Sequence, residues 1–155
     1  VSAYASGQYM HTKNGNNIAY AGDYLATKGK QEVGAPQFSG SLGLTYNDGK
    51  WFGNFTLQYT GAQYATLMND QSIPGYVTAN LGFGRRLPQI GHVSPKIKLN
   101  LVNLGDNHYL SSMYGYTTNA KTQHGVLTGK SLSGSQPTYV IGSPFVVTAT
   151  LSADF

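Results

Sequence analysis

The feature that most constrains the fold is an alternation of apolar and polar side chains with a period of two residues. It is strictest in residues 144–155, PFVVTATLSADF. One set of alternating positions is apolar throughout: Phe145, Val147, Ala149, Leu151, Ala153 and Phe155. The positions between them are polar apart from the first: Val146, Thr148, Thr150, Ser152 and Asp154. Because successive side chains of a strand point to opposite faces, this pattern predicts a strand with one apolar and one polar face.

Five further stretches repeat the alternation. They are residues 1–10, 37–46, 51–61, 76–84 and 96–103, the first being the weakest. No window of the chain fits the helical spacing i, i+3, i+4 as well. We therefore predict an all-β chain with six strands and no helix.

The composition agrees with such a chain and excludes a helical membrane protein. Only 10% of the residues are charged, whereas ordinary globular chains have about 25%. Glycine accounts for 20 of the 155 residues and tyrosine for 12, which is typical of strands joined by polar loops. No apolar run approaches the ~20 residues that a membrane helix needs. A membrane barrel stays possible, because its strands are only half apolar.

Several function classes find no support. The absence of cysteine excludes disulfides and thiolate metal sites. The net charge is +4, but Arg85-Arg86 is the only adjacent basic pair, so we expect no nucleic-acid partner. No GxSxG, HExxH or phosphate-loop motif is present, and we expect neither catalysis nor a cofactor. The histidines have no ligand spacing, so we predict no metal site: His11, His92, His108 and His124.

The connections between the predicted strands alternate between long and short. The short ones are a tight turn at Asn47-Asp48-Gly49, where Asp-Gly suits a two-residue hairpin with positive φ, and residues 85–94. The long ones are residues 13–36, 62–72 and 106–143. An up-and-down meander therefore puts all long loops at one end. Short periplasmic turns and long extracellular loops are the pattern of outer-membrane barrels.

Aromatic residues near the strand ends suit the two interfacial girdles of such a barrel. They are Tyr46, Trp51, Phe52, Tyr59, Tyr64, Tyr76 and Phe83. In lipid every backbone polar group must be paired, which a closed barrel achieves. Six strands are fewer than the eight of the smallest common barrels. We therefore expect an antiparallel up-and-down transmembrane β-barrel segment that belongs to a larger barrel.

Two stretches and the terminal strand resemble the carboxyl-terminal end of TonB-dependent outer-membrane receptors. The stretches are IPGYVTANLGFG and KIKLNLVNLGDNHY. The family's penultimate strand commonly ends in Asn-Leu-Phe-Asp, with a Tyr two to three residues later. The matching residues here are Asn103, Leu104, Asp106 and Tyr109, while Gly105 stands where Phe is usual. GAPQFSGSLGLTY and WFGNFTLQYTGAQY are also similar to that family, so the resemblance spans nearly the whole chain.

The resemblance implies a 22-stranded barrel that encloses a plug domain, with residues 1–155 as its last six strands. Such receptors lie in the outer membrane of Gram-negative bacteria and take up a scarce, bulky nutrient such as a ferric siderophore. The loops and plug capture the ligand, and the TonB complex drives plug rearrangement through an amino-terminal TonB box. Neither plug nor TonB box is visible here. Leu151, Ala153 and Phe155 resemble the signal that the barrel-assembly machinery reads, and the apolar face would contact outer-membrane lipid.

Two groups of residues are candidates for ligand contact. Lys96, Lys98 and Asn100 share a polar face and are expected to face the lumen. They either steer an anionic ligand or contact the plug, or they are solvated or paired with carboxylates on neighbouring strands. The other group is the loop tyrosines Tyr20, Tyr24, Tyr114 and Tyr116. Amphipathic rings can close over a sugar or a siderophore, or they order their own loops.

Two other interpretations of the strands stay open. One is a passive porin-type barrel, which a plug domain upstream would exclude. The other is a soluble or fibril-forming β-rich fragment, because weakly charged strands with unpaired edges can pair with other chains. Partition into detergent separates the second interpretation from a barrel segment.

Overall fold

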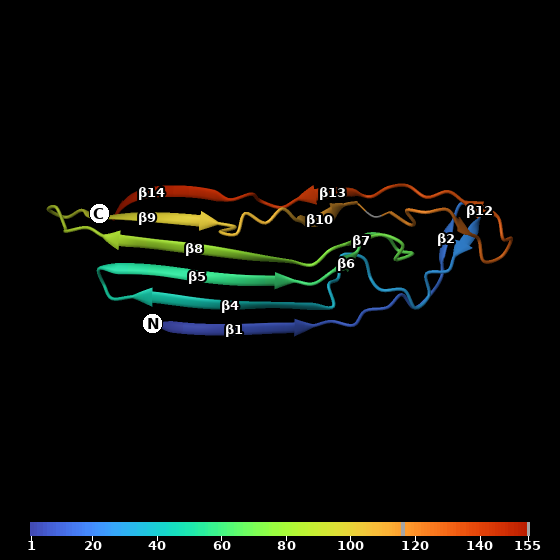
Figure 1. The fold of residues 1–155 in the computed structure, drawn as a ribbon, viewed down its shortest axis with the longest axis horizontal. Helices are drawn as coiled ribbons and strands as arrows, with labels where there is room; N and C mark the ends of the chain where they lie inside the picture. Colours follow the sequence, from blue (N-terminus) through green and yellow to red (C-terminus); the bar gives the residue numbers. More distant parts are fainter. Residues whose placement is uncertain (116, 155) are drawn as a thin grey trace.

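The computed structural model describes residues 1–115 and 117–154 and contains, within these ranges, strands but no helix. No helix there is long and apolar enough to cross a membrane. Six long strands form one sheet, and the three long loops extend from one end of it (Figure 1). The long strands are β1 (Ser2–Tyr9), β4 (Phe38–Asn47), β5 (Trp51–Thr60), β8 (Tyr76–Arg86), β9 (Ser94–Val102) and β14 (Val146–Asp154).

The sheet is an up-and-down meander, as predicted. Its strand order is β1-β4-β5-β8-β9-β14, and each long strand pairs antiparallel with the next long strand along the chain. β1 and β14 lie at the two edges, so the sheet does not close on itself. The six predicted strands are therefore confirmed.

The register collects side chains of like polarity on each face. Leu42 lies opposite Leu57, and Thr150 lies opposite Lys98. The apolar face is uncovered: Leu42 is 54% exposed and Leu151 is 74% exposed. The predicted alternation is confirmed, and it leaves the sheet without a buried interior of its own.

The aromatic residues expected at two girdles divide into two groups. Four are exposed on the apolar face: Tyr46, Trp51, Tyr59 and Phe83. For the other three the expectation is wrong. Phe52 lines a cavity on the polar face, because it shares a side of β5 with Asn54. Tyr64 lies in the short strand β6, and Tyr76 stacks on Tyr109 with ring centroids 4.2 Å apart.

The β4–β5 turn forms where it was predicted, with a different use of Asp48. Gly49 has φ of +89°, whereas Asp48 is not in the left-handed region. The Asp48 carboxylate instead accepts hydrogen bonds from the Trp51 and Lys50 amides at 2.6 and 2.9 Å and from the Tyr46 hydroxyl at 2.7 Å. The Trp51 amide, followed by the Tyr46 hydroxyl, lowers the pKa of Asp48.

The three long connections contain short strands that were not predicted from the sequence. We call these connections the first loop (10–37), the second loop (61–75) and the third loop (103–145). The short strands are β2 (Ile18–Tyr20), β3 (Asp23–Leu25), β6 (Gln63–Tyr64), β7 (Ser72–Ile73), β10 (Leu110–Tyr114), β11 (Gln123–His124), β12 (Ser131–Leu132) and β13 (Thr138–Ile141). They pair as β2–β3, β6–β7, β10–β13 and β11–β12. Strands of two to five residues are too short for a period of two to be recognised.

The hydrophobic core lies in these loops and not in the sheet. Among the described residues, the buried hydrophobic side chains are Leu25, Val33, Ala65, Met68, Ile73, Ala120 and Leu132. Leu25, Met68 and Leu132 form a cluster with one member from each loop, and Tyr20 packs against it. The three loops therefore fold around a common centre beyond the strand ends, which we call the loop platform (10–37, 61–75 and 103–145).

Candidate functional site

A buried carboxylate joins the first loop to the third. Asp23 is 3% exposed and accepts hydrogen bonds from the amides of Leu127 and Thr128 at 2.9 and 3.0 Å. The Thr128 hydroxyl also donates to it. The Thr128 hydroxyl, then the Leu127 and Tyr24 amides, hold the pKa of Asp23 far below its usual range. Asp23 is therefore an ionised latch on the tip of the third loop.

The approach of Asp23 to the third loop requires a glycine. A Cβ atom at Gly125 would overlap the Asp23 carboxylate. The Gly125 amide donates to the Lys130 carbonyl at 2.9 Å, which closes the tip of the third loop on itself. Gly125 therefore provides the space into which the latch fits.

A second carboxylate joins the second loop to the third. Asp70 accepts hydrogen bonds from the amides of Ala120 and Lys121, both at 2.9 Å, from the Gln123 side chain at 3.1 Å and from the Thr66 hydroxyl at 2.7 Å. Partial burial alone would raise the pKa of Asp70, but these hydrogen bonds outweigh it and lower the pKa. Asp70 thus fixes residues 120–123 against the second loop.

The first and second loops are joined by an amide pair. The Gln31 backbone amide donates to the Asn69 side-chain oxygen at 2.6 Å, and the Asn69 side-chain nitrogen donates to the Gln31 backbone carbonyl at 2.9 Å. The Gly34 amide adds a hydrogen bond to the Tyr64 carbonyl at 3.0 Å. Each loop is thus bonded to both others, so the loop platform is preorganised as one unit.

The platform presents exposed apolar side chains and a cavity. At its tip, Val126 and Leu127 are 49% and 69% exposed, held in place by Asp23 and by a hydrogen bond from the Val126 amide to the Tyr24 carbonyl. A cavity of about 380 Å³ lies between the loops. Its lining comes from all three loops: Val33, Gly34, Gln63, Ser112, Met113 and Gly115. Exposed anchors on a rigid base suit capture of a ligand with apolar surface.

The loop tyrosines take different positions on the platform. Tyr20 packs against the loop core, which agrees with a role in ordering its own loop. Tyr24 and Tyr114 are 42% and 81% exposed. Tyr116 lies outside the described residues. Ligand contact by the tyrosines stays a prediction, and the geometry favours Tyr24 and Tyr114 for it.

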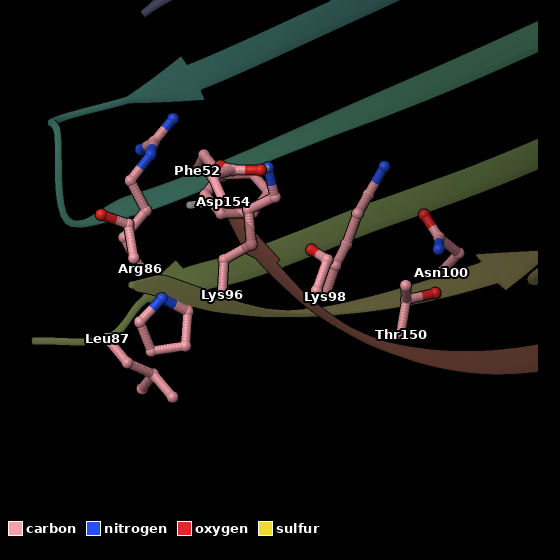
Figure 2. Close-up of a pocket in the computed structure, with 11 residues that line it drawn as sticks. Phe52, Arg86, Leu87, Lys96, Lys98, Asn100, Thr150 and Asp154 are labelled. Carbon is pink, nitrogen blue, oxygen red and sulfur yellow. Dashed lines mark hydrogen bonds and ion pairs between the residues drawn. The ribbon is translucent and has the colours of Figure 1, made fainter. Parts of the chain in front are cut away.

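The polar face of the sheet carries a basic cavity of about 570 Å³ at the end with the short turns. Figure 2 shows Arg86, Lys96 and Lys98 projecting to the same side of the sheet. Asn100 also lines the cavity. Lys96 forms an ion pair of 3.0 Å with Asp154 on the neighbouring strand, the one salt bridge found among residues 1–115 and 117–154. Lys96 is thus paired with a carboxylate on a neighbouring strand, whereas Lys98 faces the cavity and has no carboxylate partner in these ranges.

The residues of the family-like motif close the last long hairpin. Asn103 is 1% exposed with φ of +53°, and its side-chain nitrogen donates to the carbonyls of Asn107 and Ser143 at 3.0 and 2.9 Å. Asp106 accepts the Phe145 amide at 2.9 Å. These bonds fasten the end of β9 to the start of β14, so these motif residues have a structural role here.

The other two motif residues also contribute to this closure. The Leu104 amide donates to the Ala79 carbonyl at 2.8 Å, which ties the motif to β8. The Tyr109 ring stacks on Tyr76 and occupies the space where a Cβ at Gly142 would lie. The motif therefore connects three strands.

The remaining predicted residues lie at the sheet edge or are dispersed. Leu151 and Ala153 are exposed on the apolar face of the edge strand β14, and Phe155 lies outside the described residues. The four histidines are all exposed. Over residues 1–115 and 117–154, no group of His, Cys, Asp or Glu could hold a metal ion.

The residues that organise the platform were not predicted from the sequence. Asp23 and Asp70 received no role, and neither did Asn119, which is fully buried and donates to the carbonyls of Lys121, Leu132 and Ser133. The available signal was weak: Asp70 is the only charged residue in the sequence of the second loop, but Asp23 shares the first loop with four other charged residues, Lys13, Lys28, Lys30 and Glu32. Their partners, up to 105 residues away, follow no local pattern.

Comparison with known proteins identifies the fold. No protein-family model and no curated protein matches the chain. The siderophore receptor PiuA from Acinetobacter baumannii matches with a TM-score of 0.67 at 16% identity, over 98% of this chain and 19% of that one. The ferric citrate transporter FecA in its unliganded form matches with a TM-score of 0.66 at 18% identity, over 97% and 20%. The chain thus shares the fold of a segment of these receptors and spans about a fifth of their length.

Proposed function

We propose that residues 1–155 form the last six strands of the barrel of a TonB-dependent outer-membrane receptor in a Gram-negative bacterium. The receptor takes up a scarce, bulky nutrient such as a ferric siderophore by active transport. This segment supplies barrel wall, three extracellular loops and the carboxyl-terminal assembly signal for the barrel-assembly machinery. The plug and the contact with the TonB complex belong to other parts of the receptor.

The observation that carries the proposal is the position of the hydrophobic core. The described buried apolar side chains lie in the loop platform, while the apolar face of the sheet leaves Leu42, Val147 and Leu151 more than half exposed. A face of this kind is stable where an apolar medium covers it. Lipid on one side and a polar lumen on the other satisfy both faces. The likeness to two receptors over nearly the whole chain supports the same placement.

The geometry of the loop platform is suited to ligand capture. Its loops are bonded to one another before any ligand binds, so binding costs little loop ordering. Exposed Tyr24 and Leu127 offer apolar contact on the outside. The basic cavity with Lys98 and Arg86 lies at the opposite end of the strands, where it can attract an anionic ligand or contact the plug.

Uptake of radioactive iron by cells that carry or lack the complete receptor tests the proposal. Ferric citrate and a catecholate ferric siderophore serve as probes, with and without a protonophore. We expect receptor-dependent uptake that the protonophore abolishes. Uptake that persists with the protonophore would indicate a passive porin, and recovery of the protein in the soluble fraction would contradict a membrane location.

Substitution at the loop tip tests where the ligand binds. Leu127→Ala is expected to weaken ligand binding about threefold to tenfold, because it removes an exposed apolar anchor. Ile90→Ala is the matched control, since Ile90 is 73% exposed in the short connection at the other end of the sheet. Equal effects of the two substitutions would contradict capture by the platform.

A further inference from the structure

The adjacent arginines Arg85 and Arg86 end strand β8 and point to opposite faces of the sheet. Each lies over an aromatic ring: the Arg85 guanidinium carbon is 5.1 Å from the centroid of Trp51, and that of Arg86 is 4.8 Å from the centroid of Phe52. Arg86 and Phe52 line the basic cavity on the polar face. Arg85 and Trp51 are registered partners on the apolar face. The pair therefore places one cation on each side of the sheet.

The two arginines differ in how their donors are satisfied. Arg86 donates to the Asn47 side chain at 3.0 Å and to the Gly49 carbonyl at 3.2 Å. The Nε of Arg85 is buried and has no hydrogen-bond partner among the described residues. Asp48 is the carboxylate of the adjacent turn, and it accepts hydrogen bonds from Tyr46, Lys50 and Trp51. Within the described ranges, no carboxylate forms an ion pair with Arg85.

An apolar groove begins at Trp51, the ring over which Arg85 lies. Its volume is about 440 Å³, and Trp51 is one of its walls. The groove runs over Gly53, which has no side chain, and a Cβ atom there would lie only 2.9 Å from the Gly82 carbonyl oxygen. The residues that line the groove on the apolar face are Leu44, Tyr46, Trp51, Phe55, Leu81 and Phe83. A cation with no anionic partner among the described residues thus stands at the turn end of an apolar groove.

We propose that Arg85, Trp51 and this groove form a binding site for one glycerophospholipid of the surrounding membrane. The lipid phosphate would accept hydrogen bonds from the Arg85 guanidinium, whose planar fork matches phosphate oxygens. An acyl chain would lie along the groove over Gly53. Charge complementarity selects the occupant, because a neutral apolar partner would leave Arg85 unpaired in an apolar environment, which is costly. Trp51 suits the headgroup level through its amphipathic ring.

This inference rests on the membrane placement in the proposed function, and it adds a specific lipid partner to it. The site would select the leaflet on the side of the short turns. Arg85 would act as an anchor that sets the depth of β5 and β8 in the membrane. Arg86, already bonded to the turn, would take no part.

Lipid titration of the complete receptor, purified in detergent and followed by native mass spectrometry, tests the site. The probes are dioleoylphosphatidylglycerol and dioleoylglycerol, which share their acyl chains and differ in the anionic phosphoglycerol headgroup. We expect the unmodified receptor to bind the phospholipid about tenfold more tightly, as a charged hydrogen bond provides. Arg85→Gln should abolish this preference and leave dioleoylglycerol binding unchanged. Arg86→Gln is the matched control and should retain the preference.

Equal losses in both variants would overturn the site, because they would indicate diffuse attraction between basic protein and anionic lipid. An unchanged preference in Arg85→Gln would also overturn it. If Arg85→Gln does not fold, Arg85→Lys keeps the charge without the planar fork and should lose about threefold in phospholipid affinity; no loss would refute the proposed contact. The titration needs no siderophore, so a receptor that fails in iron uptake can still show the Arg85-dependent preference.

Discussion

The sheet and the loop platform differ in how their apolar side chains are kept from water. In the platform, Leu25 and Ile73 are completely buried by protein. In the sheet, Leu42 and Leu151 are more than half exposed. Full burial of such a side chain contributes about 1.5–3 kcal/mol. The platform therefore obtains this stabilisation within the chain, whereas the sheet depends on the medium that covers it.

The two regions also differ in how they satisfy polar groups. The sheet pairs its backbone in a regular ladder from β1 to β14. The platform has short ribbons, and it relies on side chains such as Asp23, Asp70 and Asn119 to bond backbone amides and carbonyls. Irregular backbone can be buried only if such partners exist.

A charge in the middle of the apolar face should have the largest effect. We expect Leu42→Arg to lower the free energy of unfolding by about 2–4 kcal/mol, because the guanidinium would lie in hydrocarbon. Ser41→Arg, one residue away on the polar face, is the control and should lower it by at most about 1 kcal/mol, because it breaks only the exposed hydrogen bond between the Ser6 and Ser41 hydroxyls. Urea unfolding in lipid vesicles measures both. Similar losses from the two would contradict lipid on the apolar face.

Asn103 joins the two regions, and its replacement should be next in size. Asn103→Ala leaves the buried partners of the amide unsatisfied, at a cost of about 1–3 kcal/mol, and puts alanine in a left-handed backbone, which adds about 1–2 kcal/mol. Asn103→Gly should lose only the first part. The same unfolding measurement applies. If both variants were equally unstable, the positive φ of Asn103 would carry no cost.

Disturbing the Asp23 latch should open the platform without affecting the sheet. In Gly125→Ala the new methyl group would displace the Asp23 carboxylate, so hydrogen exchange at the Leu127 and Thr128 amides should rise on the order of tenfold. Gly15→Ala is the control, because a Cβ at Gly15 meets nothing within 4 Å. Asp23→Asn should add little to Gly125→Ala, since both break one contact. Faster exchange throughout β5 would contradict independent regions.

Acid should act on the platform through Asp23 and Asp70, whose pKa values both lie below the usual range. A carboxyl whose pKa is lower in the folded than in the unfolded state stabilises the folded state at pH values above its unfolded-state pKa of about 3.9. This stabilisation is lost as the pH falls through the folded-state pKa. Pulsed hydrogen exchange should show constant protection of the third loop from about pH 7 to about pH 4, with loss below that. A loss already complete at about pH 5 would contradict ionised latches.

The Lys96–Asp154 ion pair should have the smallest effect. Its side chains are 37% and 69% exposed, and exposed pairs contribute about 0–1 kcal/mol. Lys96→Met and Asp154→Asn, alone and together, measure the coupling in a double-mutant cycle at low and high salt. A coupling well above about 1 kcal/mol would mean that the pair is shielded from water.

The sequence predicted the sheet, because the pattern that identifies a strand lies in residues that are neighbours along the chain. Alternation identified six strands and assigned faces to residues such as Lys98 and Leu151, and the lengths of the connections predicted the meander. It failed for Phe52, which was grouped with interfacial aromatics although its position in the alternation with Asn54 puts it on the polar face. The candidate site was predicted less well, because its tyrosines were chosen by loop position alone.

By itself the sequence determined the two-faced strands, their order and the end at which the loops lie, because a period of two residues and the length of a connection are both local features of the chain. Only the tertiary structure decided how the loops join. Asp23 meets Thr128 across 105 positions of the chain, and Asp70 meets Ala120 across 50. Such contacts form between groups that the sheet brings to one end, and they depend on shape and hydrogen-bond geometry in space.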